Sequence, residues 1–244
     1  MKKGTFTING VTSQELNSLI QERPSIPSAR RKVSTKSVPG ISGDYVFDEE
    51  AWENVSFELS FFTVGKTEQE VNQLKDWITA TFNTGDYVDL VLYHDQDYVY
   101  EVRVEREPEY EPDGRTPFLL PYTVGFSARP FKRLVYPDVY EGVTSLSINN
   151  PTPYTSEPEI TLYGNGDMQL HVNGLVYNFK EIDEHVHVDS ESQNAYKGSG
   201  YQVVNRNHRM IAMDFPTFKT GPNSVSVQGG ATGFRVLPRW RMKL

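Results

Sequence analysis

A clear alternation of apolar and polar residues lies in NVSFELSFFTV, residues 54–64. Its apolar and polar residues fall on opposite parities: Val55, Phe57, Leu59 and Phe61 against Ser56, Glu58 and Ser60. Successive side chains of a strand point to opposite faces. The segment is therefore predicted to be a strand with one face buried and one face exposed.

The next segment, TEQEVNQLKDWITATF (residues 67–82), changes to a helical period. Its apolar residues recur at intervals of three to four: Val71, Leu74, Ile78 and Phe82. Thr67 and Glu70 have the spacing of a capping box, which satisfies free backbone N–H groups at the start of a helix. Gly85 is expected to end this helix. Such a stripe predicts a helix packed on the core rather than a cofactor pocket.

Strand patterns surround this helix. TFTI comes before it, and YVDLVLY, DYVYEVRV and LLPYTVGFSARPF come after it. HDQD, residues 94–97, is interpreted as a turn between two of these strands rather than a carboxylate–histidine cluster. VPGISGDYVF is interpreted as a loop because of its proline and two glycines. The first half is therefore predicted to be a β domain with one helix.

The second half shows no helical period. SLSINN, EITLYG, DMQLHV, LVYNF, EIDEHVHVD, MIAMDF and NSVSVQ are short strand patterns at the spacing typical of a sandwich. Asn173-Gly174 indicates a tight hairpin. FKRLVYPDVYEG is the expected junction. The chain is thus predicted to be mainly β, with one domain at residues 1–135 and a second at residues 136–244.

The C-terminal segment FRVLPRWRMKL is predicted to be a further strand. One parity is apolar and is expected to face inward: Phe234, Val236, Pro238, Trp240, Met242 and Leu244. The other parity is basic and is expected to face solvent or a partner: Arg235, Arg239, Arg241 and Lys243.

Composition narrows the class of protein. Of the 244 residues, 37% are hydrophobic and 23% are charged, which is typical of a globular protein. No apolar run approaches the roughly 20 residues of a membrane span, and the N-terminus lacks the apolar core of a signal peptide. With no cysteine, disulfides and thiolate sites are excluded. The net charge of −8 argues against general binding to nucleic acid, and the three cations Arg30, Arg31 and Lys32 are too few to change that.

The candidate chemistry is concentrated in EHVHVDSES, residues 184–192. His185, His187 and Asp189 would share one face of a strand, and imidazole plus carboxylate is a ligand set of metal sites. His185 and His187 would be about 6.7 Å apart, but Asp189 would lie about 13 Å from His185. A third ligand would have to come from another strand. The segment is therefore interpreted as a solvent-facing row on a structural strand.

No other motif indicates catalysis. The chain has neither a glycine-rich phosphate loop nor a G-x-S-x-G elbow. Its 14 tyrosines, 13 phenylalanines and 3 tryptophans could form a sugar-stacking platform, so a lectin-like module stays open as an alternative. We expect no enzyme, no cofactor, and no catalytic, cofactor-binding or metal-binding residue.

Taken in order, the segments resemble the distal tail protein (Dit) family of siphophages that infect Gram-positive bacteria. The first half is similar to the ring-forming domain of that family in TFTINGVTSQEL, PGISGD, ENVSFELSF, the helix and VGFSARPF. The second half is similar to its galectin-like sandwich in NNPTPYTSEPEITLYGNGDMQLHVNG, in VHVDSES followed by Tyr196, in DFPTFKTGPNSVSVQGG and in PRWRMKL. The length matches the compact type, which lacks a long arm or a carbohydrate-binding insertion.

The resemblance implies a structural role in the virion. Such proteins form a homo-hexameric ring at the phage tail tip and are assembled in the cytoplasm of the bacterial host. The expected partners are the tail tube protein, the tail-associated lysin or tip protein, and receptor-binding proteins. DNA would pass through the channel without specific binding and no membrane span is expected. Another ring or tube protein of the same tail is the nearer alternative.

A channel that lets DNA slide should lack clustered cations, because cations drive binding to phosphate. We therefore expect neutral or acidic residues on its wall. The candidates are Glu68, Glu70 and Asp76 on the predicted helix, and a predicted loop at Glu107–Asp113. A wall formed by Arg30, Arg31, Lys32 and Lys36 would contradict this expectation.

Overall fold

The computed structural model describes residues 1–112 and 114–244, and these divide into two compact units. The first unit contains Met1–Val135 together with Lys243–Leu244, and the second contains Tyr136–Met242. Two backbone hydrogen bonds hold the C-terminus in the first unit. The Leu244 amide donates to the carbonyl of Pro130 (3.1 Å), and the Leu244 carbonyl accepts from the amide of Ala29 (2.9 Å). The second unit therefore ends two residues before the predicted domain does.

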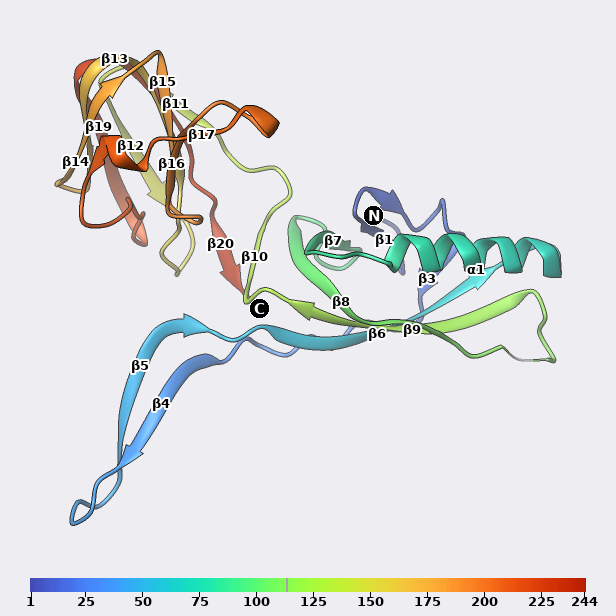
Figure 1. The fold of residues 1–244 in the computed structure, drawn as a ribbon. Helices are drawn as coiled ribbons and strands as arrows, with labels where there is room; N and C mark the ends of the chain where they lie inside the picture. The colour runs from blue at the N-terminus through green and yellow to red at the C-terminus, as the bar shows by residue number, and fades with distance from the viewer. Residues whose placement is uncertain (113) are drawn as a thin grey trace. The chain divides into compact units, whose positions relative to one another are not determined.

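The first unit is built on one curled antiparallel sheet (Figure 1). The order of its main path is β2–β1–β7–β8–β9–β6–β3. Its strands, in chain order, are β1 (Phe6–Ile8), β2 (Val11–Thr12), β3 (Ser18–Ile20), β6 (Val55–Val64), β7 (Val88–Leu92), β8 (Tyr98–Tyr110) and β9 (Leu119–Ala128). Off this path lie β10 (Phe131–Leu134), which pairs with β8, and β20 (Arg241–Lys243), which pairs with β10.

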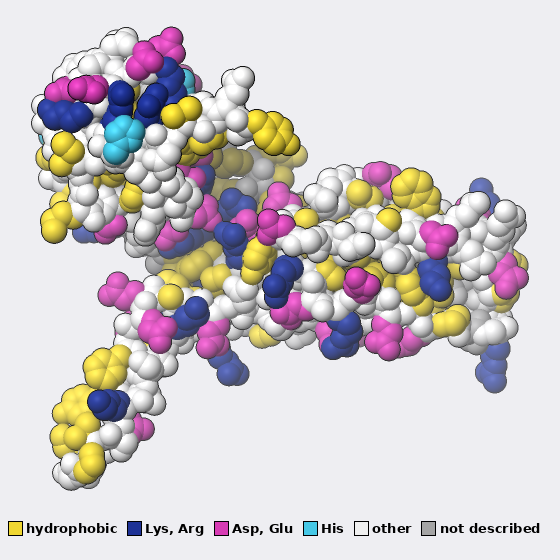
Figure 2. All heavy atoms as spheres, viewed as in Figure 1, with side chains coloured by type: hydrophobic (Ala, Val, Ile, Leu, Met, Phe, Trp, Pro, Cys, Tyr) yellow, Lys and Arg dark blue, Asp and Glu magenta, His cyan; other side chains and the backbone are white. Residues whose placement is uncertain are grey.

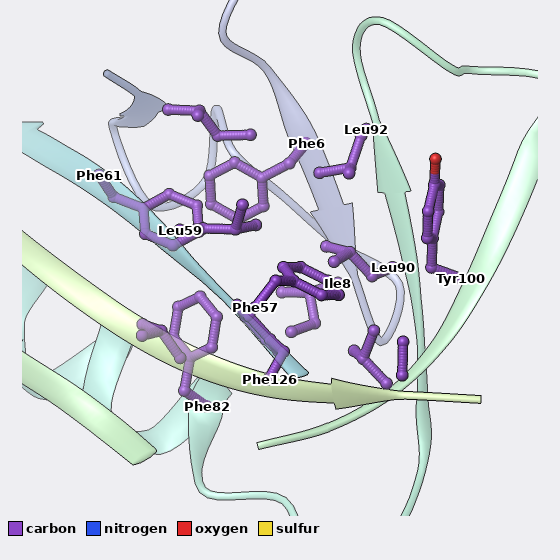
Figure 3. Packing of buried hydrophobic residues seen from close by; sticks show 14 of the residues in the cluster. Phe6, Ile8, Phe57, Leu59, Phe61, Phe82, Leu90, Leu92, Tyr100 and Phe126 are labelled. Carbon is purple, nitrogen blue, oxygen red and sulfur yellow. The ribbon is translucent and has the colours of Figure 1, made fainter. Parts of the chain in front are cut away.

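The predicted alternation of β6 is confirmed. Val55, Phe57, Leu59 and Phe61 are buried, while the serines and the glutamate between them are exposed. The Phe61 ring lies 5.1 Å from Tyr122 and 5.8 Å from Phe82, measured between ring centroids. Figure 3 shows how rings and aliphatic side chains from β1, β6, β7, β9 and the helix fill this core.

The predicted helix is α1 (Glu68–Phe82), and its buried face consists of the four predicted apolar residues. Thr67 is the N-cap, and its hydroxyl accepts from the backbone amide of Glu70 (3.2 Å). The Glu70 carboxylate accepts in return from the amide of Lys66 (2.7 Å), one residue before the cap. The helix ends at Phe82 rather than near Gly85, because the backbone of Asn83, the C-cap, has left the helical conformation.

A long hairpin projects from this unit where a loop was expected (Figure 1). Strands β4 (Arg31–Ser37) and β5 (Asp44–Trp52) pair antiparallel, and within the described residues they form a sheet of two strands. The loop prediction for VPGISGDYVF is therefore wrong in its second half. Pro39, Gly40 and Gly43 make a turn, and the strand resumes at Asp44.

The second unit contains a second antiparallel sheet, whose main path is β11–β19–β13–β15–β16–β17. Strand β12 adds to β19, and β14 and β18 extend from β13. The strands are β11 (Tyr140–Gly142), β12 (Ser145–Asn150), β13 (Glu159–Val172), β14 (Leu175–Ile182), β15 (His185–Asp189), β16 (Asn194–Lys197), β17 (Val204–Asn205), β18 (Met210–Ile211) and β19 (Gly221–Leu237). Two short 3-10 turns lie at Gly200–Gln202 and Asn207–Arg209.

The predicted strands EITLYG and DMQLHV form one continuous strand, β13. Its register against β19 shifts between Tyr163 and Met168, where both strands carry glycines. A Cβ atom on Gly164 would lie 2.1 Å from the carbonyl oxygen of Gly230, so this close approach requires glycine. Before the shift β13 pairs with β15, and after it with β14. The mainly β architecture predicted from the sequence is confirmed.

Candidate functional site

The β4–β5 hairpin exposes apolar side chains that its own chain leaves uncovered. Between 49% and 64% of each residue is exposed at Val33, Ile41, Tyr45, Val46 and Phe47. Figure 2 shows hydrophobic side chains gathered along the projecting hairpin. An isolated two-stranded hairpin is marginally stable in water, and a contiguous apolar patch usually marks an interaction surface.

The base of the hairpin is fixed by an ion pair. The Arg31 guanidinium donates to both carboxylate oxygens of Asp48, at 2.7 and 2.5 Å. Its hydrogen bond holds the pKa of Asp48 below the usual value. Of the three adjacent cations, Arg31 is thus paired within the hairpin. This pairing agrees with the interpretation that the three cations do not form a nucleic-acid patch.

A second apolar surface of the first unit lies along α1. A hollow of about 480 Å³ is lined by residues of α1 and of the β2 region, among them Val11, Leu16, Leu74 and Trp77. The Trp77 side chain is prominent there, since 68% of the residue is exposed. The first unit therefore carries two different uncovered apolar surfaces.

In the second unit, strand β15 carries the histidines predicted to face solvent. The prediction of an exposed row is wrong in degree, because His185, His187 and Asp189 are half-buried. Strands β13 and β16 flank β15 on both sides. The His187 ring stacks on Tyr196 of β16, with centroids 4.9 Å apart, and its Nδ1 lies 2.9 Å from the hydroxyl of Thr161. Burial lowers the pKa of His187.

Asp189 forms an ion pair with Arg239, a residue that the sequence pattern assigned to an exposed face. The Arg239 guanidinium donates to Asp189 (2.5 Å), to Glu159 (2.8 Å) and to Glu191 (3.2 Å). Only 16% of the Arg239 side chain is exposed and its partners are in the same chain, so the expectation that it faces solvent or a partner is wrong. The cause is that β19 ends at Leu237, after which the chain leaves the strand and Arg239 adopts a positive φ of 52°.

The carboxylates around β15 are paired with Arg239 in this cluster. Burial disfavours the charged form of Asp189, but the hydrogen bond and charge of Arg239 outweigh it and hold its pKa below the usual value. Within residues 1–112 and 114–244, no group of three or more His, Asp or Glu side chains is placed to hold a metal ion. The assignment of no metal, cofactor or catalytic residue remains a prediction.

Beside this cluster lies a pocket of about 570 Å³. Its wall includes Glu159, His187, Asn194, Tyr196, Ser199 and Asn205. These residues come from β13, β15, β16, the turn after β16, and β17. Of them, His187 and Tyr196 were singled out from the sequence, although neither was assigned to a pocket.

Sequence reasoning missed both the hairpin and the pocket. A signal for the hairpin was present: β-branched and aromatic residues flank the Pro39-Gly40 turn on both sides. The pocket had no such local signal, since its wall depends on the pairing of four strands. Over the described residues, no helix is long and apolar enough to cross a membrane.

Comparison with known proteins places this architecture among phage tail proteins. Residues 5–120 match the family described as phage tail protein RIFT-related domain. The crystal structure of SPP1 Dit, described as a paradigm of the hub adsorption apparatus in phages infecting Gram-positive bacteria, has a TM-score of 0.69 at 14% identity. The similarity covers 95% of this chain and 97% of that one.

Two further structures share the fold over nearly the whole chain. They are chains of the phage p2 baseplate in its activated conformation, with strontium and with calcium, each with a TM-score of 0.50 at 10% identity. Each match covers 98% of both chains. No curated protein sequence matches the chain. Residues 5–120, just under half of the chain, thus match the phage tail protein RIFT-related domain family, and the chain has the fold of a siphophage distal tail protein.

Proposed function

We propose that this protein is a distal tail hub, six copies of which close into a ring that joins the tail tube to the tail tip. Its family and fold are those of structural phage tail proteins rather than enzymes. The observation that carries the proposal is the uncovered apolar hairpin, β4–β5, on a chain with this fold. In the virion the ring would contact the tube protein, the tail-associated lysin or tip protein, and receptor-binding proteins.

A closed ring of identical chains needs a heterologous interface, in which two different surfaces of each subunit meet. The first unit offers two: the hairpin patch, and the hollow beside Trp77. In this proposal the hairpin of one subunit covers apolar surface of the next, and the hollow along α1 is its candidate acceptor. Burying five half-exposed apolar side chains per subunit would remove a surface that is costly in water.

DNA passage is the finer part of the proposal. It is supported by the net charge of −8 per chain, which six copies multiply. Of the candidate wall residues, Glu68, Glu70 and Asp76 lie on α1, and Glu107–Tyr110 belong to β8 rather than to a loop. Asp113, the last of the predicted segment, lies outside the described residues.

The proposal is tested by the assembly state of the purified chain. Negative-stain images are expected to show six-fold rings, and light scattering is expected to show a hexamer that dissociates on dilution. Phe47→Asp places a charge in the hairpin patch and should leave monomers that fold normally. Trp77→Asp tests the acceptor in the same way.

Val64→Asp is the matched control, because Val64 is also an exposed apolar strand residue of the first unit but lies outside the hairpin. It should assemble like the unchanged protein. A chain that stays monomeric at high concentration, or a Phe47→Asp variant that forms rings as readily as the control, would contradict the proposal. Normal rings from Trp77→Asp would reject the hollow as acceptor and leave the ring itself standing.

The nearer alternative, a tube protein, predicts a different assembly. Tube subunits stack ring on ring, so purified protein should form filaments, whereas a hub should stop at one ring or a pair of rings. The same images therefore separate the two.

A further inference from the structure

The pocket of the second unit lies on a sheet face that two cross-strand rows build. One row runs through Thr161, His187, Tyr196 and Asn205, which are direct partners on β13, β15, β16 and β17. The neighbouring row consists of Glu159, Asp189 and Asn194. The residues between these rows on the same strands, Ile160, Val188 and Ala195, are buried in the core. The polar composition therefore belongs to one face of the sheet.

Several hydrogen-bonding groups of the pocket are left without a partner by the fold. Among the described residues, no hydrogen bond uses His187 Nε2, the Tyr196 hydroxyl, the Asn205 side-chain NH2 group or the Ser199 hydroxyl. The Asn205 side-chain oxygen is taken, since it accepts from the amide of Asn207 (2.9 Å). The rest of the wall is already satisfied: His187 Nδ1 bonds to Thr161, and the Asn194 side chain bonds to Asn207 and Ser192. The free groups are thus donors and acceptors held at fixed positions by their strands.

The aromatic wall is rigid. Tyr196 packs against His187 with an interplanar angle of 24°, so the phenol ring cannot rotate freely. The part of the ring that stays exposed lines the pocket. The face of an aromatic ring carries partial negative charge and attracts weakly positive C–H groups that lie flat against it. A saturated ring with C–H groups on its face and hydroxyls at its edge can pack against the tyrosine ring and also bond to the free polar groups of the wall.

The charge of the pocket selects against anions. Glu159, Asp189 and Glu191 surround a single guanidinium, that of Arg239, so the cluster is net negative. Arg235, which pairs with Thr161 in the same row, offsets part of this charge. His187 faces Glu159, His185 and Arg235, and its lowered pKa keeps it neutral near pH 7. A phosphate or carboxylate in the pocket would meet the Glu159 carboxylate of its wall, beside this cluster.

We propose that this pocket binds one residue of a neutral saccharide, with the sugar ring against Tyr196 and its hydroxyls bonded to His187, Asn205 and Ser199. The volume of about 570 Å³ is within the range of pockets that bind small ligands. This inference stands on the second unit alone and does not depend on ring assembly.

Saturation-transfer NMR on the full chain tests the proposal, because it observes the ligand and tolerates any assembly state. The probes are D-glucose, D-galactose and N-acetyl-D-glucosamine, with glucose 1-phosphate as the anionic comparison. At least one neutral sugar should show saturation transfer, and glucose 1-phosphate should bind more weakly than glucose. Tyr196→Ala should weaken binding by about tenfold, since it removes the ring and the hydroxyl together.

Tyr196→Phe keeps the ring and its packing on His187, so it remains informative if the alanine variant unfolds. It should weaken binding by about fivefold through the loss of one hydrogen bond. The matched control is Tyr163→Ala, which removes a tyrosine from β13 on the same sheet face but outside the pocket wall, and which should bind normally. The proposal is overturned if no neutral sugar binds, if both Tyr196 variants bind like the control, or if glucose 1-phosphate binds more tightly than glucose.

Discussion

Strands β5 and β6 follow one another in the chain and are both rich in aromatic and β-branched residues, yet their burial is opposite. Phe61 of β6 is fully buried, whereas 54% of Phe47 in β5 is exposed. The difference lies in their neighbours, since β6 is paired on both sides by β3 and β9, while β5 has β4 as its one partner among the described residues. The same apolar chemistry therefore stabilises the fold in one strand and is left for a partner in the other.

This distinction extends to the polar groups of the second unit. The carboxylates around Arg239 are paired within the chain, whereas some polar groups of the pocket beside them, such as the Tyr196 hydroxyl, have no partner among the described residues. Positions satisfied within the chain should affect stability when they are changed. Positions left unsatisfied should affect binding instead, and each prediction below tests one side of this comparison.

The largest effect is expected from Phe61→Ala in the core of the first unit. The change leaves a cavity between Phe6, Phe82 and Tyr122 and should cost about 3–5 kcal/mol of unfolding free energy. Urea unfolding, with hydrogen exchange to assign the transition to the first unit, measures it. A cost below about 1 kcal/mol would mean that β6 is not the centre of this core.

That core is also the part of the fold which the sequence predicts best. The alternation in β6 predicts a strand and the helical period of α1 predicts a helix, because each element buries one face against its own domain. Thr67 and Glu70 set the start of the helix as the motif indicates. These are local patterns, and the structure follows them to within a few residues.

The hairpin and the pocket could not be predicted in the same way. Alternation identifies strands by assuming that apolar residues are buried, and β5 violates that assumption at Tyr45, Val46 and Phe47. The pocket depends on the register that aligns His187 with Tyr196 and Tyr196 with Asn205. Neither alignment follows from the sequence of β15, so the histidine motif alone indicated only an exposed row.

A smaller loss is expected from Arg239→Met in the second unit. The change keeps the aliphatic stem but leaves Asp189 and Glu159 half-buried without their cation, which should cost about 2 kcal/mol at pH 7. Thermal and urea unfolding of the second unit measure this cost. The control is Arg235→Met, an exposed residue of β19 that should change little.

The stability lost in Arg239→Met should become smaller as the pH is lowered. The folded pKa of Asp189 is lowered, so its contribution is complete above the ordinary carboxyl pKa of about 3.9 and is lost as the pH falls through the folded value. The gap in stability between Arg239→Met and the unchanged protein should therefore narrow at pH 3. A gap that is equal at pH 7 and pH 3 would show that packing, not charge, sets the cost.

The helix cap should have an effect of about 1 kcal/mol. Thr67→Ala removes the hydroxyl that accepts from the Glu70 amide, and the loss should appear as a lower urea midpoint of the first unit. Thr81→Ala is the control within the same helix, because its hydroxyl bonds back to the Trp77 carbonyl and caps nothing. If both variants lost equal stability, the cap would not be the cause.

The smallest effect on stability is expected from Phe47→Ala, and it completes the contrast with Phe61→Ala. Since half of the Phe47 surface is already in water, truncation should change the unfolding free energy of dissociated subunits by less than about 0.5 kcal/mol. The amides of β4 and β5 should exchange rapidly in the monomer, as expected for a hairpin without a covering layer. They should become protected on assembly, and Phe47→Ala should weaken that protection. A loss near that of Phe61→Ala in the monomer would show that the hairpin is covered by its own chain in solution, which would remove the reason to assign it to a partner.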